Sequence, residues 1–193
     1  MCAGGGFYSR FLTPLNGDSL MAKGFRDLFE LELKDLYSAE KHLTAALPKM
    51  AKAATNDDLR QAFESHLEET EGQIERLERI FKQLDIAYAR VEKCEAMEGL
   101  IEEGEGIMAE GLEPSVLDAA LICAAQRVEH YEIAGYGCAR TFAQQLGHQE
   151  IADLLQETLD EEGNADKKLT ELAESVVNEE AEAAGVGDNV DEE

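Results

Sequence analysis

Tryptophan is absent from this 193-residue chain, and proline occurs only three times. Because proline interrupts helices, its scarcity, together with abundant Ala, Leu, Glu and Lys, favours a largely helical protein. The four cysteines include no Cys-x-x-Cys pair, which argues against a zinc knuckle or a thioredoxin-type redox site. No run of eighteen apolar residues could cross a membrane, and no secretory signal opens the chain. We therefore expect a cytoplasmic protein.

Positive charge is scarce as well. Lys and Arg number 17 against 42 Asp and Glu, which gives a formal net charge of −25. A field of this sign repels phosphate backbones and anionic lipids, so neither nucleic acid nor a membrane is an expected partner. It is compatible with metal cations, although a solvated acidic surface has the same composition. Hydrophobic residues make up 44% of the chain, which is enough for the core of one domain.

The two ends of the chain differ from its middle. Residues 1–20 contain a Gly-Gly-Gly run and no helical period, which predicts a flexible leader. Met21 begins a segment that looks like an ordinary start, so the true start is expected at either Met1 or Met21. Residues 178–193 are rich in acids and are expected to form a disordered tail. The domain is therefore predicted to span residues 21–177.

Four long helical patterns fill this domain. They cover residues 25–51, 57–87, 114–146 and 150–177, and a short helix is expected near residues 94–103. A Thr55-Asn56-Asp57 cap signal, Pro114 at a first helical position and Gly147 after a helix mark three of the boundaries. Two tight turns and one long connection predict an all-α four-helix bundle with one long crossover. That connectivity is the ferritin-like one.

Charged residues interrupt the apolar stripe of every predicted long helix near its middle. Burying several ionised carboxylates together is prohibitive unless they are protonated or hold cations. Carboxylates with one imidazole form an oxygen-rich ligand set that suits Fe or Mn. The interrupting residues, in helix order, are Glu40, then His66 with Glu69, then Glu129 and Glu132, then Glu161 and Glu162.

A weak internal repeat supports a shared site. Glu69 follows Glu40 by 29 residues, and Glu161 follows Glu132 by the same interval. Two copies of one helix hairpin would gather paired carboxylates around a pseudo-axis, as a two-metal site requires. The repeat favours Glu161 as the ligand, whereas the heptad phase favours Glu162. We predict Glu161 and keep Glu162 as the alternative.

The pattern departs from the usual di-iron bundle. That pattern has Glu-x-x-His on two helices, whereas His66-x-x-Glu69 has the reverse order and residues 150–177 contain no histidine. Tyr37 and Tyr136 fall near the level of the acids and are candidates for hydrogen bonds to the ligands.

Five segments carry a family resemblance: residues 35–41 (DLYSAEK), 46–50 (ALPKM), 63–70 (FESHLEET), 128–134 (VEHYEIA) and 158–162 (TLDEE). They resemble the YciE/YciF family of ferritin-like bacterial proteins, and the resemblance covers residues 25–173. It implies a ferritin-like bundle that is frequently a homodimer, a link to stress responses and a ferroxidase-type activity. The ligands it implies are Glu40, His66, Glu69, Glu129, Glu132 and Glu161.

These residues support two hypotheses. In the first, two Fe or Mn ions per chain occupy the bundle centre, and the protein oxidises Fe(II) with oxygen or peroxide. In the second, it is a metal-free helical stress protein that acts as a dimeric interaction module, with its inner acids protonated or exposed.

Overall fold

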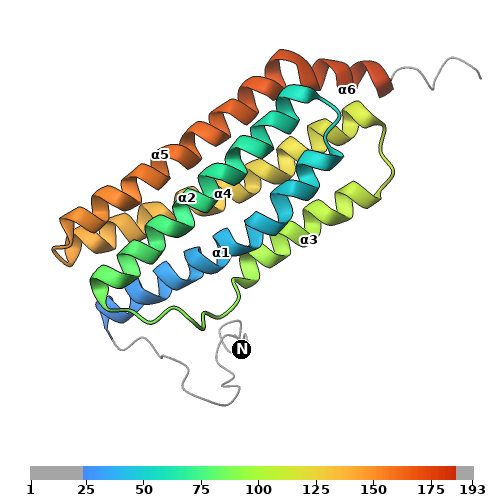
Figure 1. The fold of residues 1–193 in the computed structure, drawn as a ribbon. Coiled ribbons are helices and arrows are strands. Elements are labelled where there is room, and N and C mark those ends of the chain that lie inside the picture. The colour runs from blue at the N-terminus through green and yellow to red at the C-terminus, as the bar shows by residue number, and fades with distance from the viewer. Residues whose placement is uncertain (1–23, 186–193) are drawn as a thin grey trace, which may run out of the picture.

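The computed structural model describes residues 24–185, and every regular element in that part of the chain is a helix (Figure 1). The four long helices are α1 (Phe25–Ala53), α2 (Asp57–Leu84), α4 (Pro114–Gln145) and α5 (Gln149–Leu172). A shorter helix, α3 (Glu95–Ala109), lies in the crossover, and a π-helical turn (Ala173–Val177) joins α5 to α6 (Asn178–Gly185).

The long helices lie side by side as a bundle, with α3 alongside the α1 and α4 side of it (Figure 1). Three-residue turns make α1 antiparallel to α2 and α4 antiparallel to α5, and residues 85–113 carry the chain along the bundle between the two pairs. The predicted all-α bundle with one long crossover is therefore confirmed.

The residues expected to begin or end helices lie at the helix ends in the structure. The Asn56 side chain accepts hydrogen bonds from the backbone N–H groups of Asp58 and Leu59, both at 3.0 Å. Pro114 occupies the first turn of α4, where its missing N–H costs nothing. Gly147 adopts φ of 81°, a left-handed conformation that ends α4 and turns the chain into α5.

The C-terminal end of the bundle differs from expectation. The π-helical turn adds one residue to the helix, so Val177 is buried while Val176, which the regular period would place inside, is 38% exposed. Residues 178–185 then form α6, whose Ala- and Glu-rich sequence favours helix, so the tail predicted to be disordered from 178 is helical over its first half. The predicted leader, residues 1–20, and residues 186–193 lie outside the described residues.

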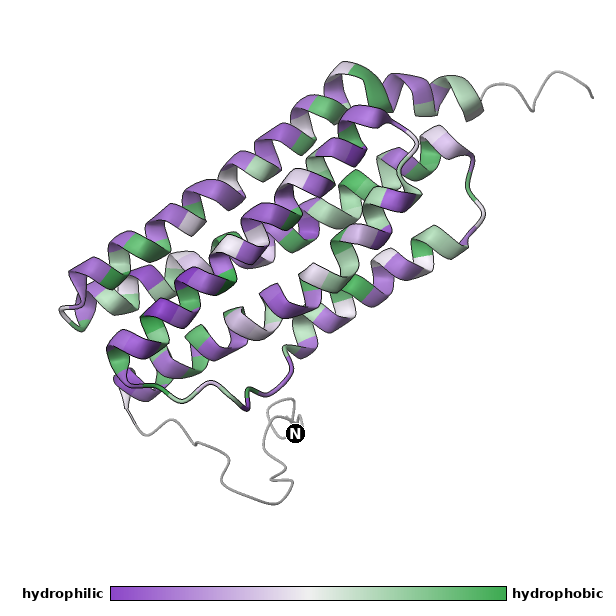
Figure 2. Cartoon of the chain, viewed as in Figure 1, coloured by the Kyte–Doolittle hydropathy of each residue, from purple (hydrophilic) through white to green (hydrophobic). Residues whose placement is uncertain are grey.

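Apolar side chains fill the bundle as two separate clusters. One contains Leu47, Leu59 and Phe63, and the other contains Leu33, Leu77 and Tyr136. Hydrophilic and hydrophobic residues alternate along the long helices (Figure 2). None of the helices between residues 24 and 185 has the length and apolar character that a membrane crossing requires.

A buried carboxylate fastens the α1–α2 turn to α4. Asp118 is 2% exposed, and its oxygens accept hydrogen bonds from Thr55 N (2.8 Å), Thr55 Oγ1 (2.5 Å) and Asn56 N (2.9 Å). One side chain thereby satisfies two backbone donors at the start of α2 and links the two hairpins.

We predict that Asp118→Ala lowers the free energy of unfolding by about 2–3 kcal/mol, because the three donors lose a charged acceptor in a partly buried place. Urea denaturation followed by circular dichroism measures this. The control, Asp58→Ala, removes an exposed carboxylate from the first turn of α2 and is expected to cost less than about 1 kcal/mol. Equal losses in the two variants would contradict the role given to Asp118.

Candidate metal centre

A layer of ionisable side chains separates the two apolar clusters. We call it the polar layer, and its ionisable members come from all four long helices. Each is less than 10% exposed. They are Glu40 on α1, His66 on α2, Glu129 and Glu132 on α4, and Glu162 on α5.

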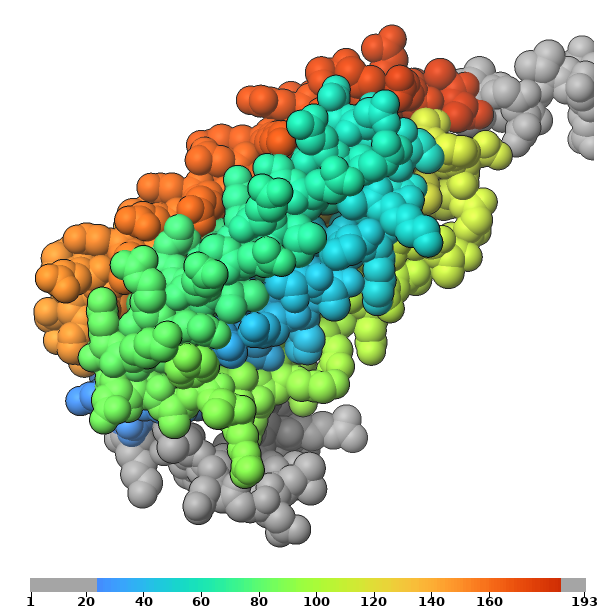
Figure 3. Space-filling model, viewed as in Figure 1, coloured from blue at the N-terminus to red at the C-terminus, as the bar shows by residue number. Residues whose placement is uncertain are grey.

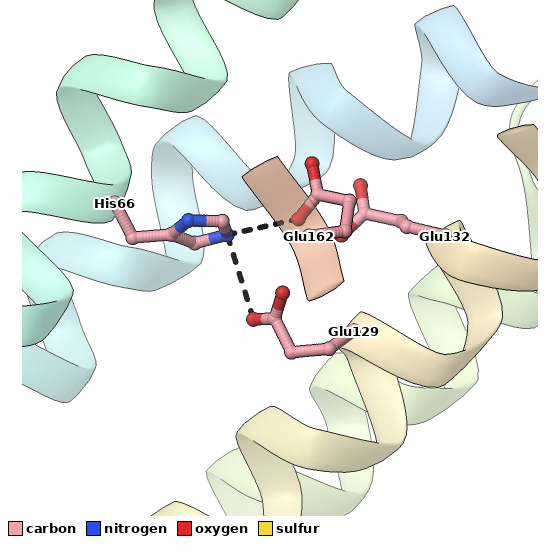
Figure 4. Close-up of side chains that lie close together, drawn as sticks. All are labelled: His66, Glu129, Glu132 and Glu162. Atoms are coloured by element: carbon pink, nitrogen blue, oxygen red, sulfur yellow. Dashed lines mark ion pairs between the residues drawn. The ribbon is translucent and has the colours of Figure 1, made fainter. Parts of the chain in front are cut away.

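Four of these side chains converge on one point. His66 Nε2 lies 3.4 Å from Glu129 Oε1 and 3.6 Å from Glu162 Oε2 (Figure 4). One ligand atom from each of His66, Glu129, Glu132 and Glu162 can be chosen so that all four lie within 4.8 Å of one another. Ligands on opposite sides of one cation are roughly 4–5 Å apart, so this group needs little adjustment to surround an ion.

Glu40 reaches the same layer from α1 and is held by a tyrosine. The buried Tyr136 hydroxyl donates a hydrogen bond to Glu40 Oε1. Tyr136 therefore lies beside the candidate ligands and hydrogen-bonds to one of them, as predicted. Tyr37 does not, because its hydroxyl donates instead to Glu78, at 3.0 Å, away from the layer.

Many polar atoms of the layer are buried without a hydrogen-bond partner among the described residues. Such atoms are rare in folded proteins, because each one costs about 1–3 kcal/mol. A cation bound between carboxylates satisfies several of them at once, so the residues present fit a metal. The atoms are Glu40 Oε2, His66 Nε2, Thr70 Oγ1, Gln73 Oε1, Glu129 Oε2, both carboxylate oxygens of Glu132, and Glu162 Oε2.

Burial controls the protonation of the acids. Desolvation raises the pKa of Glu40 to about 8, although the Tyr136 hydrogen bond opposes it, and raises the pKa of Glu162 to about 7. Burial and the neighbouring carboxylates raise the pKa values of Glu129 and Glu132 well above the ordinary range. Burial lowers the pKa of His66, but the carboxylates around it outweigh this effect and raise it to about 10.

Glu69 lies outside the polar layer, which corrects its prediction as an inner ligand. Its Oε2 is 3.2 Å from His66 Nδ1, on the side of the ring away from Glu129, and its side chain is 46% exposed. The hydrogen bond with His66 lowers the pKa of Glu69. A carboxylate on one ring nitrogen fixes the orientation of the imidazole and directs the other nitrogen, here Nε2, into the layer.

Glu161 is also corrected in favour of its neighbour. Arg76 donates two hydrogen bonds of 2.9 Å to the Glu161 carboxylate and holds it near the surface, whereas Glu162 is fully buried. The repeat matched Glu161 to Glu69, and both of these face outward. One position further along, it matches Glu162 to Thr70, and both of these are buried. The heptad phase was the better guide.

Gln73 is a buried residue of the polar layer to which the sequence reasoning gave no role. Its Nε2 donates to Glu162 Oε1 at 2.5 Å and to Glu161 Oε2 at 3.2 Å, so it holds the inner carboxylate in place. The signal was its position seven residues after His66 on the same apolar stripe, where a buried amide needs a partner.

Comparison with known proteins places the chain in a family. Residues 24–182 match the domain of unknown function DUF892. The chain belongs to this family. Protein YciF of Escherichia coli K12 is 52% identical over 160 residues, which cover 83% of this chain and 96% of that protein. The resemblance to the YciE/YciF family seen in the sequence is therefore confirmed.

Solved structures agree with this assignment. The crystal structure of the E. coli stress protein YciF matches with a TM-score of 0.78, covering 81% of this chain and 98% of that chain. YcfI of Rhodopseudomonas palustris, described provisionally as a structural protein, is 44% identical with a TM-score of 0.74 over 80% of this chain and 98% of its own. A Xanthomonas campestris protein is 22% identical with a TM-score of 0.66 over 84% and 99%, and shares the fold.

We predict that the metal-free protein loses stability as the pH rises from 5 to 8. Glu40 and Glu162 keep their protons when folded but ionise near pH 4.5 when unfolded, so the folded state binds more protons across this window. His66 acts in the same direction above pH 6.5. Urea denaturation of chelator-treated protein at the two pH values measures the loss.

The matched variant is Glu162→Gln, whose side chain does not titrate. Between pH 5 and pH 8, the free energy of unfolding of the wild type is expected to fall by about 2 kcal/mol more than that of this variant. Parallel losses in the two proteins would mean that Glu162 ionises equally easily in the folded and unfolded states.

Proposed function

We propose that this relative of the stress protein YciF binds two Fe or Mn ions per chain in the polar layer and uses them to oxidise Fe(II) with oxygen or peroxide. Such an activity would limit iron and peroxide toxicity under stress. The observation that carries the proposal is the concentration, between two apolar clusters, of buried polar atoms that have no hydrogen-bond partner among the described residues. Without a bound ion, the burial of these atoms would strongly destabilise the fold, and cations between them would remove that destabilisation.

Some residues of the site would bind the metal ions, and others orient the side chains that bind them. His66, Glu129, Glu132 and Glu162, whose ligand atoms lie within 4.8 Å of one another, would hold the ions together with Glu40. When bound, the ions would supply one-electron redox chemistry for Fe(II) and the oxidant. Carboxylate charge would favour the higher oxidation state.

Hydrogen bonds from neighbouring residues hold the ligand side chains so that they point into the polar layer. Glu69 fixes the His66 ring through Nδ1, Gln73 donates to Glu162, and the Tyr136 hydroxyl donates to Glu40. The apolar clusters close the layer toward both ends of the bundle. Charge–charge interactions in such a place are stronger than at a surface.

A second candidate is a metal-free stress protein that acts as a homodimeric interaction module. The raised pKa values of the buried glutamates favour it, because neutral carboxyl groups can share a layer without cations. The description of the R. palustris relative as a structural protein points the same way. The metal content of the native protein separates the two candidates.

We predict that protein purified without chelator retains about two Fe or Mn ions per chain, measured by elemental analysis. Glu162→Gln is expected to lose at least one of them, because it removes a buried anionic ligand. Glu161→Gln changes the neighbouring carboxylate in the same way and is expected to retain both. Metal-free wild-type protein whose melting temperature does not respond to added Fe(II) or Mn(II) would favour the second candidate.

We further predict that anaerobic Fe(II) loading followed by air gives a near-ultraviolet absorbance rise at least ten times faster than the same Fe(II) in buffer. Glu132→Ala removes a buried carboxylate whose two oxygens have no hydrogen-bond partner among the described residues, and it is expected to reduce the rate to that of buffer. Glu161→Gln serves as the control and should keep the wild-type rate. A wild-type rate equal to the buffer rate would contradict the oxidase activity while leaving metal binding intact.

A further inference from the structure

A cavity connects the polar layer with the surface along the seam between α2 and α5. Its volume is about 140 Å³, and its inner wall includes His66 and Glu129. Both side chains are more than nine-tenths buried, and each has an atom without a hydrogen-bond partner in the described chain. Four other hollows in the described part of the molecule include none of the polar-layer residues. α2 and α5 lie side by side on the face shown in Figure 3.

A small residue keeps this seam open. Ala165 lines the cavity from α5, and in the internal repeat its counterpart in the first hairpin is Gln73, a long side chain that reaches into the layer. An alanine at this position leaves space that a glutamine would fill. The resulting cavity has room for several waters or a partly hydrated cation but not for a sizeable organic molecule.

Charged groups stand at the outer end. Glu69, Glu161 and Lys168 line the cavity there, and Glu69 also touches the His66 ring at 3.2 Å. Lys168 interacts electrostatically with Glu69. Arg76 neutralises Glu161, so Glu69 is the anion that an arriving ion meets, with one ammonium group beside it.

We propose that this seam is the portal through which divalent cations enter and leave the polar layer, with Glu69 as their first carboxylate and Lys168 as the group that limits their rate of arrival. The inference rests on the proposed metal binding. It assigns Glu69 a role in the transfer of cations between solvent and the inner ligands. The ends of the bundle are not entry routes in this proposal, because the two apolar clusters close them.

Stopped-flow mixing of metal-free protein with Co(II), followed by its visible absorption, tests the portal without relying on turnover. Ala165→Leu places three more carbon atoms in the cavity and is expected to slow Co(II) loading at least tenfold while the final amount bound is unchanged. Ala45→Leu makes the same change in a groove beside α1 that reaches no polar-layer residue, and should load at the wild-type rate.

A charge-reversal pair gives a second measurement that does not depend on filling the core. Lys168→Glu places an anion at the portal and is expected to speed loading several-fold at low ionic strength. Lys167→Glu makes the same change in net charge one residue away, at a position that does not line the cavity, and should have a smaller effect.

The outcomes separate the two proposals. A wild-type protein that binds no Co(II) at equilibrium would overturn the proposed metal binding, and the portal with it. Full binding at equilibrium, with Ala165→Leu loading as fast as the wild type or with Lys168→Glu and Lys167→Glu indistinguishable, would overturn the portal alone.

Discussion

Mutual repulsion among carboxylates in one buried layer is the constraint on which the rest of this structure depends. Glu40, Glu129, Glu132 and Glu162 share a cross-section of the bundle with a single imidazole, and each is almost completely buried. A bundle built only for stability would fill this level with leucine. Retaining the acids makes sense when their charge is neutralised by something the layer can take up, either protons or metal ions.

The architecture around the layer serves this constraint. Two apolar clusters supply the folding energy from opposite ends, so the middle of the bundle can carry polar groups without losing the fold. Contacts such as Asp118 with the α1–α2 turn hold the two hairpins in register, and therefore hold the ligand atoms of four helices at one level. Positioning residues then fix individual side chains: Glu69 from outside the layer, Gln73 within it and Tyr136 beside it.

Helix periodicity was sufficient to predict the bundle, its crossover and four of the inner residues that meet at one level: His66, Glu129 and Glu132, with Glu40 beside them. It also favoured Glu162 over Glu161, but the internal repeat favoured Glu161, and the sequence alone could not show that Arg76, a residue on another helix, holds the Glu161 carboxylate near the surface. Glu69 was misassigned for a related reason. Spacing shows that it faces the same side as His66, but only coordinates show on which side of the ring it lies.

The π-helical turn at Ala173–Val177 has the signature of a single added residue absorbed by a helix. Its location matters for how this family can change by mutation. An insertion at this place rotates only the residues after it, Val177 and α6, and leaves the ligands where they are. The insertion of one residue into α5 before Glu162 would turn that carboxylate about 100° away from the layer. Length variation in α5 is therefore tolerable on one side of Glu162 and damaging on the other.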